Sequence, residues 1–188
     1  MLIVSISGVS GAGKTTLQHS LSKKFDCRGV ISCTTRKKRE IDKEDEYCFY
    51  SETEFVKISD FLWQRQMHGN LYGTRESHLI DALKKSNLAS IVVAVDCIQP
   101  LDIFCEENNL QHLALYLLAP SEIELVERLR NRGTDVNEIR LRINECASWD
   151  KQASAMSFVH LLKAKSVIQI ARRAEKLIVS KQLGSGYT

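Results

Sequence analysis

Apolar runs of strand length alternate along the chain with segments in which apolar residues recur at helical spacing. The apolar runs lie at residues 2–7, 91–95, 112–118 and 157–162. Helical spacing follows near residues 14–25, 101–108, 121–132 and 167–181, and a further helix is expected to run towards Trp149. Strands that alternate with helices pair in parallel and carry helices on both faces. The pattern therefore predicts an α/β fold with a central parallel sheet.

The stretch from residue 34 to residue 75 departs from this alternation. Its short strand-like runs lie at residues 47–50 and 61–67, and a capping box lies at residues 51–54. Thr74 is expected to cap a helix, and residues 28–33, just before this stretch, are expected to form a second short strand. The departure predicts a small subdomain inserted into the α/β core.

The first apolar run leads into residues 8–15, which fit G-x-x-x-x-G-K-[ST], the pattern of a phosphate-binding loop, or P-loop. The glycines let backbone N–H groups approach a phosphate, Lys14 supplies a charge for the β- and γ-phosphates, and the Thr15 hydroxyl can ligate Mg²⁺. A glycine-rich turn without a ligand is disfavoured, because strand, loop and helix occur in the required order. The expected phosphate-binding residues are Gly8, Ser10, Gly11, Ala12, Gly13, Lys14, Thr15 and Thr16.

Asp96 directly follows the apolar run at residues 91–95. Ligands of open α/β sheets bind in the crevice outside the carboxyl ends of the strands. We therefore expect the Asp96 carboxylate to point into that crevice, where it is a second candidate ligand for Mg²⁺ beside Thr15.

The composition narrows the class of protein. The 188 residues are 44% hydrophobic and carry a net charge of +3, which suits one domain with a proper core and does not argue for nucleic-acid binding. The six cysteines form no C-x-x-C pair, and no apolar run approaches the roughly 20 residues of a membrane span. We therefore expect a cytoplasmic protein with free thiols, without a zinc site and without a membrane or nucleic-acid partner.

Three further stretches resemble motifs of the guanylate kinase family. Residues 32–39, followed by Tyr47, resemble its substrate-phosphate motif, residues 69–74 resemble its G-N-x-Y-G-[ST] segment, and residues 128–135 resemble its lid. Together with the P-loop, they occur in the family's order and at nearly its spacing over residues 2 to about 145. The chain is therefore identified as a member of this family.

The resemblance implies a three-layer P-loop fold of the nucleoside monophosphate kinase type and a single domain over residues 1–188. The implied parts are a core (1–33, 88–124 and 146–183), an acceptor-binding subdomain (about 34–87), a helical lid (about 125–145) and a disordered tail (184–188). The implied partners are ATP, with Mg²⁺ as cofactor, and a small phosphorylated acceptor. The protein itself is expected to be a monomer or a homodimer.

The resemblance also assigns roles to residues at matching positions. It implies that Lys14, Arg128, Arg132 and Arg142 are catalytic. The implied acceptor-binding residues are Ser32, Arg36, Arg39, Tyr47, Tyr72, Thr74 and Asp96. Arginine suits these roles because its planar, permanently charged group binds phosphate bidentately, and phosphoryl transfer depends on positioning and charge neutralisation. Ordinary surface charges are the preferred interpretation of Lys37, Lys38, Arg130 and Arg140.

The lid is expected to be open and mobile without ligand. Its helix should break at Gly133, and its arginines should lack partners until phosphates arrive.

The departures from the family pattern fall on base recognition. The position of the family's guanine-reading glutamate holds Trp63, and of the two aspartates expected near residue 95 only Asp96 is kept, with Ala94 in the place of the other. An indole N–H can only donate, so it cannot accept from the N1–H and N2–H₂ groups of guanine. Trp63 is either a core aromatic or a surface on which a base stacks. The Asn-Asp pair expected after the last strand is also missing, because residues 160–163 read His-Leu-Leu-Lys.

Three hypotheses follow for the function. The first is ATP-dependent phosphorylation of GMP or dGMP, giving GDP or dGDP and ADP. The second is phosphorylation of a sugar phosphate such as ribose 1,5-bisphosphate, since a related enzyme of phosphonate metabolism also lacks the base-reading glutamate. The third is an inactive binding module, which ranks last because Lys14, Thr15 and the lid arginines are intact.

Overall fold

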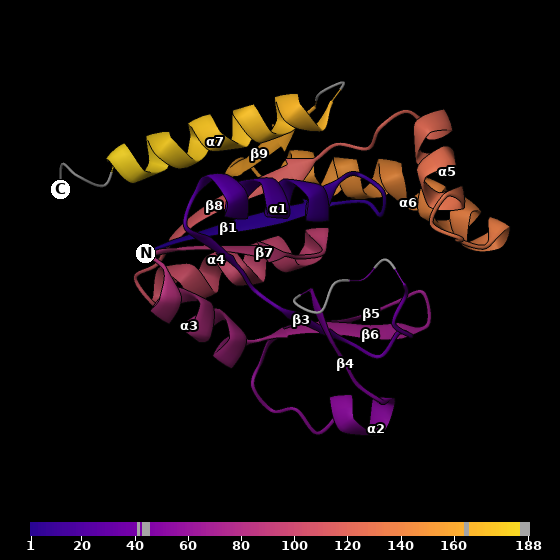
Figure 1. Cartoon of the computed structure of the whole chain (residues 1–188), viewed down its shortest axis with the longest axis horizontal. Coiled ribbons are helices and arrows are strands. Elements are labelled where there is room, and N and C mark those ends of the chain that lie inside the picture. Colours follow the sequence, from indigo (N-terminus) through magenta and orange to yellow (C-terminus); the bar gives the residue numbers. More distant parts are fainter. Residues whose placement is uncertain (41, 43–45, 164–165, 185–188) are drawn as a thin grey trace.

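The computed structural model of the chain describes residues 1–40, 42, 46–163 and 166–184. Its centre is a five-stranded sheet with the order β2-β7-β1-β8-β9, in which every neighbouring pair is parallel (Figure 1). The strands are β1 (Leu2–Gly8), β2 (Cys27–Gly29), β7 (Leu88–Val92), β8 (Gln111–Leu117) and β9 (Val159–Leu162). The predicted α/β fold with a central parallel sheet is confirmed.

Alternate residues of β1 enter two different cores, because successive side chains of a strand point to opposite faces. Leu2, Val4 and Ile6 belong to one buried cluster, and Ile3 belongs to the other. The helices α1 (Lys14–Lys24) and α7 (Val167–Leu183) cover the first face, and α3 (Glu76–Lys85) and α4 (Ile98–Glu107) cover the second. The result is the expected three layers, with β1 and the P-loop at the centre of the sheet.

A second sheet lies below the main sheet and to the right of α3 in Figure 1. Its order is β4-β3-β6-β5, from the strands β3 (Ser32–Thr34), β4 (Tyr47–Phe49), β5 (Phe61–Met67) and β6 (Asn70–Arg75). The short helix α2 (Glu52–Phe55) begins at Ser51, whose hydroxyl accepts from the Glu54 N–H while the Glu54 carboxylate accepts from the Ser51 N–H. The predicted strand at 61–67 and the predicted capping box are confirmed.

Two helices project from the carboxyl ends of the main strands, at the right of Figure 1. They are α5 (Glu122–Arg130) and α6 (Val136–Ala155). Gly133, with a φ of 70°, lies in the turn that separates them, and the Asp135 carboxylate accepts from the Asn137 N–H at the start of α6. The helix break expected at Gly133 is therefore present.

The structure corrects three boundary predictions. Residues 28–33 do not form one strand, because the chain leaves β2 after Gly29 and enters the second sheet at Ser32. The strand expected at residues 91–95 ends at Val92, where the backbone turns into a short 3₁₀-helix, Val95–Cys97. Thr74 caps no helix, since it is a residue of β6 and α3 begins after Arg75 without a side-chain cap.

In the described residues, no helix is both long enough and apolar enough to cross a membrane. Gly184 is the C-cap of α7, and the rest of the 184–188 tail lies outside the described residues.

Candidate functional site

The P-loop needs glycine for two distinct physical reasons. A Cβ atom at Gly8 would lie 2.6 Å from the Leu117 carbonyl oxygen, so the loop can leave the sheet beside β8 only without a side chain there. Gly13 has a φ of 102° and is the N-cap of α1, a conformation that L side chains rarely adopt. The loop therefore presents the amino end of α1 to one cavity, an arrangement that favours anions.

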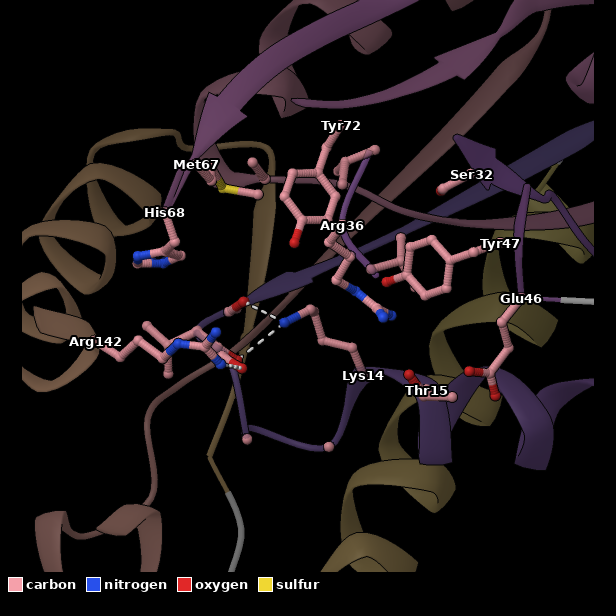
Figure 2. Close-up of a pocket in the computed structure, with 18 of the residues that line it drawn as sticks. Lys14, Thr15, Ser32, Arg36, Glu46, Tyr47, Met67, His68, Tyr72 and Arg142 are labelled. Atoms are coloured by element: carbon pink, nitrogen blue, oxygen red, sulfur yellow. Dashed lines mark hydrogen bonds between the residues drawn. The ribbon is translucent and has the colours of Figure 1, made fainter. Parts of the chain in front are cut away.

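Lys14 lies at the base of that cavity. Its ammonium nitrogen donates to the carbonyl oxygens of Gly8 (2.7 Å) and Val9 (2.9 Å), as Figure 2 shows. Burial, together with the nearby charges of Arg132 and Arg142, lowers the pKa of Lys14 to about 7. A bound polyphosphate would supply the negative charge that this group lacks.

The end of the cavity that is expected to bind the acceptor is built around Arg36. Its guanidinium makes a bidentate pair with Asp42, at 2.7 and 2.8 Å, and lies over the ring of Tyr47 at 4.8 Å. Burial alone would raise the pKa of Asp42, but hydrogen bonds from Arg36 and from the Arg39 N–H hold it below its ordinary value. The pair fixes the orientation of Arg36 before any ligand binds.

Most of the expected acceptor-binding residues surround the same cavity, which has a volume of about 390 Å³. Those that line it are Ser32, Arg36, Tyr47 and Tyr72, all labelled in Figure 2, and Arg39. Thr74 is fully buried and does not line the cavity; its hydroxyl lies 3.4 Å from that of Ser32.

The lid arginines are divided between two cavities. Arg132 and Arg142 line the first cavity. Arg128 lines a second cavity of about 660 Å³, beside Ala12 of the P-loop and Lys163. Burial first, and then repulsion from Arg39, Arg142 and Arg128, lowers the pKa of Arg132. The site therefore gathers more positive charge than it neutralises, as a polyphosphate site requires.

The expectation that the lid arginines lack partners is wrong for two of them. Arg142 donates to the Ser10 hydroxyl at 2.7 Å and to Glu138 at 2.6 Å, and Arg128 donates to the Gly11 carbonyl oxygen at 3.0 Å. Both arginines are therefore hydrogen-bonded to the P-loop itself, through the Gly11 carbonyl oxygen and the Ser10 hydroxyl.

The base-recognition positions are occupied in an unexpected way. Trp63 is 9% exposed and packs in a core cluster with Ala94, yet both residues also border the cavity. The interpretation of Trp63 as a core aromatic and its interpretation as a surface beside a base therefore each describe part of its surroundings. Asp96 does not line the cavity; its carboxylate pairs with Arg65, whose guanidinium lies 5.5 Å from the ring of Trp149. The 3₁₀-turn that ends β7 carries Asp96 away from the direction expected for a strand end.

Several lining residues had no signal in the motifs. They are His19, Glu46, Met67, His68, Glu145 and Trp149. The sequence holds only a partial signal for Glu145: it lies three residues after Arg142, so the two side chains share one side of a helix, but this spacing does not show that the helix reaches the cavity.

Comparisons with known proteins agree on one family. The family model described as guanylate kinase matches residues 1–180. A guanylate kinase of Prochlorococcus marinus subsp. pastoris is 32% identical over 183 residues, which is 95% of this chain and 97% of that protein. A guanylate kinase of Pseudomonas syringae pv. tomato is 35% identical over 160 residues, covering 76% and 72% of the two chains.

The fold has a solved counterpart as well. The crystal structure of guanylate kinase from Anaplasma phagocytophilum superposes with a TM-score of 0.67 at 21% identity, covering 96% of this chain and 86% of the other. The P-loop fold is thereby supported by structure and the family by sequence. The chain belongs to the guanylate kinase family of phosphotransferases.

Proposed function

We propose that this protein transfers the γ-phosphoryl group of ATP to the phosphate of GMP or dGMP, forming ADP and GDP or dGDP. One observation carries the proposal. A single cavity brings together a P-loop lysine, an arginine clamp in the loop after β3 and two lid arginines. Phosphoryl transfer asks for this combination, since its main requirements are in-line positioning and neutralisation of charge.

Each group has a separate task in the proposed reaction. Lys14 and the amino end of α1 hold the β- and γ-phosphates. Arg36, Arg39 and the hydroxyls of Ser32, Tyr47 and Tyr72 hold the acceptor phosphate, and Arg132 and Arg142 neutralise the charge that spreads over the transferred group. In this arrangement the adenosine of ATP occupies the second cavity, beside Arg128 and Lys163. This division places the adenosine and the acceptor nucleotide in different cavities, while the phosphates of both meet in the first.

The residues present fit Mg²⁺ as a cofactor that arrives with ATP. The described residues hold no cluster of three or more His, Cys, Asp or Glu side chains suited to a metal ion. Thr15, in the first turn of α1, lines the cavity and would hold Mg²⁺ together with phosphate oxygens, which is how the ion is commonly bound. When bound, Mg²⁺ supplies neutralisation of phosphate charge. Asp96, paired with Arg65, would contribute only after leaving that partner.

An acceptor panel tests the proposal. ADP release is measured with ATP plus GMP, dGMP, AMP, UMP, CMP or ribose 1,5-bisphosphate, each at several concentrations. GMP and dGMP should give the highest kcat/KM. A preference for ribose 1,5-bisphosphate, or no ADP release above the ATP-only rate with any acceptor, would overturn the proposal.

The inactive binding module is the other function to test. It would bind GMP without accelerating ADP release. Intact contacts of Lys14 and the lid arginines with the P-loop favour the enzyme, because a module that only binds GMP needs neither.

A further inference from the structure

The candidate cavity has two chemically different ends. Figure 2 shows Ser32 and Tyr47 on one side and Met67 and His68 on the other, with Tyr72 between them. The Ser32 end carries the arginine clamp for the acceptor phosphate. A nucleoside monophosphate whose phosphate sits in that clamp therefore directs its base towards the Met67 and His68 end.

This second end, called here the base end, comprises lining residues that lie on or against β5 and its hairpin turn: Trp63 shares a face of β5 with Met67, Glu145 contacts His68, and Trp149 follows Glu145 by one turn of α6. Its aromatic and apolar side chains suit the faces of a purine ring. The carboxylate of this end belongs to Glu145, and an ionised carboxylate accepts hydrogen bonds but donates none. Guanine presents N1–H and N2–H₂ as two adjacent donors, whereas adenine presents an unprotonated N1. The base end therefore has the polarity that matches guanine.

Glu145 is held at the mouth of this end. Its Oε2 atom lies 3.4 Å from Nε2 of His68, a residue with a φ of 47° at the turn of the β5–β6 hairpin. The Glu145 side chain is 43% exposed, so a ligand can reach it. Trp149 lies one helical turn further along α6, on the same side as Glu145.

The other carboxylates near the cavity are engaged elsewhere. Among the described lining residues, Asp42 is bound bidentately by Arg36, and Glu46, beside Tyr47 at the phosphate end, lies 3.4 Å from Nε2 of His19. Asp96 lies outside the lining and is paired with Arg65. Within the described part of the cavity, Glu145 is thus the carboxylate available to a base.

We propose that Glu145, from the lid helix α6, determines base specificity by accepting hydrogen bonds from N1–H and N2–H₂ of the acceptor guanine. His68 is a positioning residue that holds the carboxylate against the hairpin. This inference rests on the proposed function, and it names the residue that reads the base. It places base recognition on the lid, so a guanine that reaches the site also draws α6 towards the second sheet.

The test is a comparison of acceptors that differ in the two donors. GMP has both donors, IMP lacks the exocyclic amino group, and AMP also lacks N1–H. The ratio of kcat/KM for GMP to that for IMP is measured for the unmodified protein, Glu145→Gln and Glu127→Gln. Glu127 is an exposed glutamate of the lid helix α5, so its substitution removes the same charge from the same region without touching the cavity.

Glu145→Gln should lower the GMP-to-IMP ratio of kcat/KM at least about tenfold, because loss of one charge-assisted hydrogen bond typically has an effect of this size. Glu127→Gln should leave the ratio unchanged. Glu145→Asp, which retains a carboxylate on a shorter side chain, should keep part of the preference. A carboxylate that only latches the lid to His68 would instead lower kcat for all acceptors equally and leave the ratio unchanged. Equal melting temperatures of the variants show that the comparison is between folded proteins.

The outcomes separate the two proposals. If the unmodified protein phosphorylates no purine nucleoside monophosphate, the proposed function fails. If it prefers GMP and the preference survives Glu145→Gln, only the role of Glu145 fails. Loss of the preference in Asp96→Asn but not in Glu145→Gln would overturn the inference and assign guanine to Asp96.

Discussion

Substitution of Lys14 by methionine should change how the stability of the ligand-free protein depends on pH. The Lys14 nitrogen is enclosed by the P-loop and donates to two carbonyl oxygens, which a neutral amine can also do. Burial and the charges of Arg132 and Arg142 lower its pKa from 10.5 to about 7. Methionine fills a similar volume and carries no proton.

The sign and size of the effect follow from the two pKa values. Between pH 7 and pH 10.5 the unfolded chain keeps the Lys14 proton and the folded protein releases it, so stability rises with pH across this window. Below pH 7 Lys14 is protonated in both the folded and the unfolded state, and the folded protein bears the full free-energy cost of burying that charge. At about 1.4 kcal/mol per pKa unit, the unfolding free energy of the unmodified protein should rise by about 3 kcal/mol relative to Lys14→Met between roughly pH 7 and pH 9.5.

The assay is urea denaturation of both proteins, without nucleotide, at constant ionic strength and at half-unit pH steps. Only the difference between the two curves is interpreted, because every other titrating group is common to both proteins. Parallel curves, with a constant difference across the window, would refute the reasoning, since they would mean that Lys14 keeps its proton in the folded state. Lys14→Met should also lose nearly all phosphoryl transfer while remaining folded.

Three further predictions follow from particular contacts. Arg39→Ala should raise the acceptor KM and lower kcat, so that kcat/KM in steady-state ADP release falls about tenfold or more, because the substitution removes a charge-assisted contact with phosphate. Unchanged acceptor kinetics would exclude Arg39 from the clamp. Arg132→Ala should mainly lower kcat, since Arg132 lines the cavity and its charge is needed most in the closed complex; a pure KM effect would contradict this. His112→Ala should lower the unfolding free energy in urea denaturation by about 1–3 kcal/mol, because the ring of His112 joins the Ser5 hydroxyl (2.8 Å from Nε2) to the Asp102 carboxylate (2.6 Å from Nδ1). It should leave kcat/KM unchanged, since this bridge lies at the end of the sheet away from the P-loop.

The sequence was sufficient for the parts of the protein whose chemistry is local. The P-loop is a contiguous segment whose strand, turn and helix each leave a signature, and the structure has all three. The break at Gly133 and the capping box at Ser51 are equally local. Such features depend on residues within a few positions of one another, so spacing alone determines them.

The surroundings of the acceptor base could not be predicted, because they depend on contacts between distant segments. The direction of Asp96 is set by a 3₁₀-turn after β7 and by Arg65, which is 31 residues away in the chain. Thr74 matches a motif position but is buried behind Ser32. Glu145 reaches the cavity only because α6 packs near the β5–β6 hairpin, where His68 contacts it. No pattern along the chain records that approach.

The central claim is that this chain moves a phosphoryl group from ATP to a guanine nucleotide, and the most direct measurement follows that group. ATP labelled on its γ-phosphorus is incubated with Mg²⁺ and GMP, and the nucleotides are separated over time. We predict label in the β-position of GDP at the rate of ADP formation, with none in GDP when Lys14→Met replaces the unmodified protein. Label that appears only as inorganic phosphate, or GDP that stays unlabelled while ADP accumulates, would contradict it.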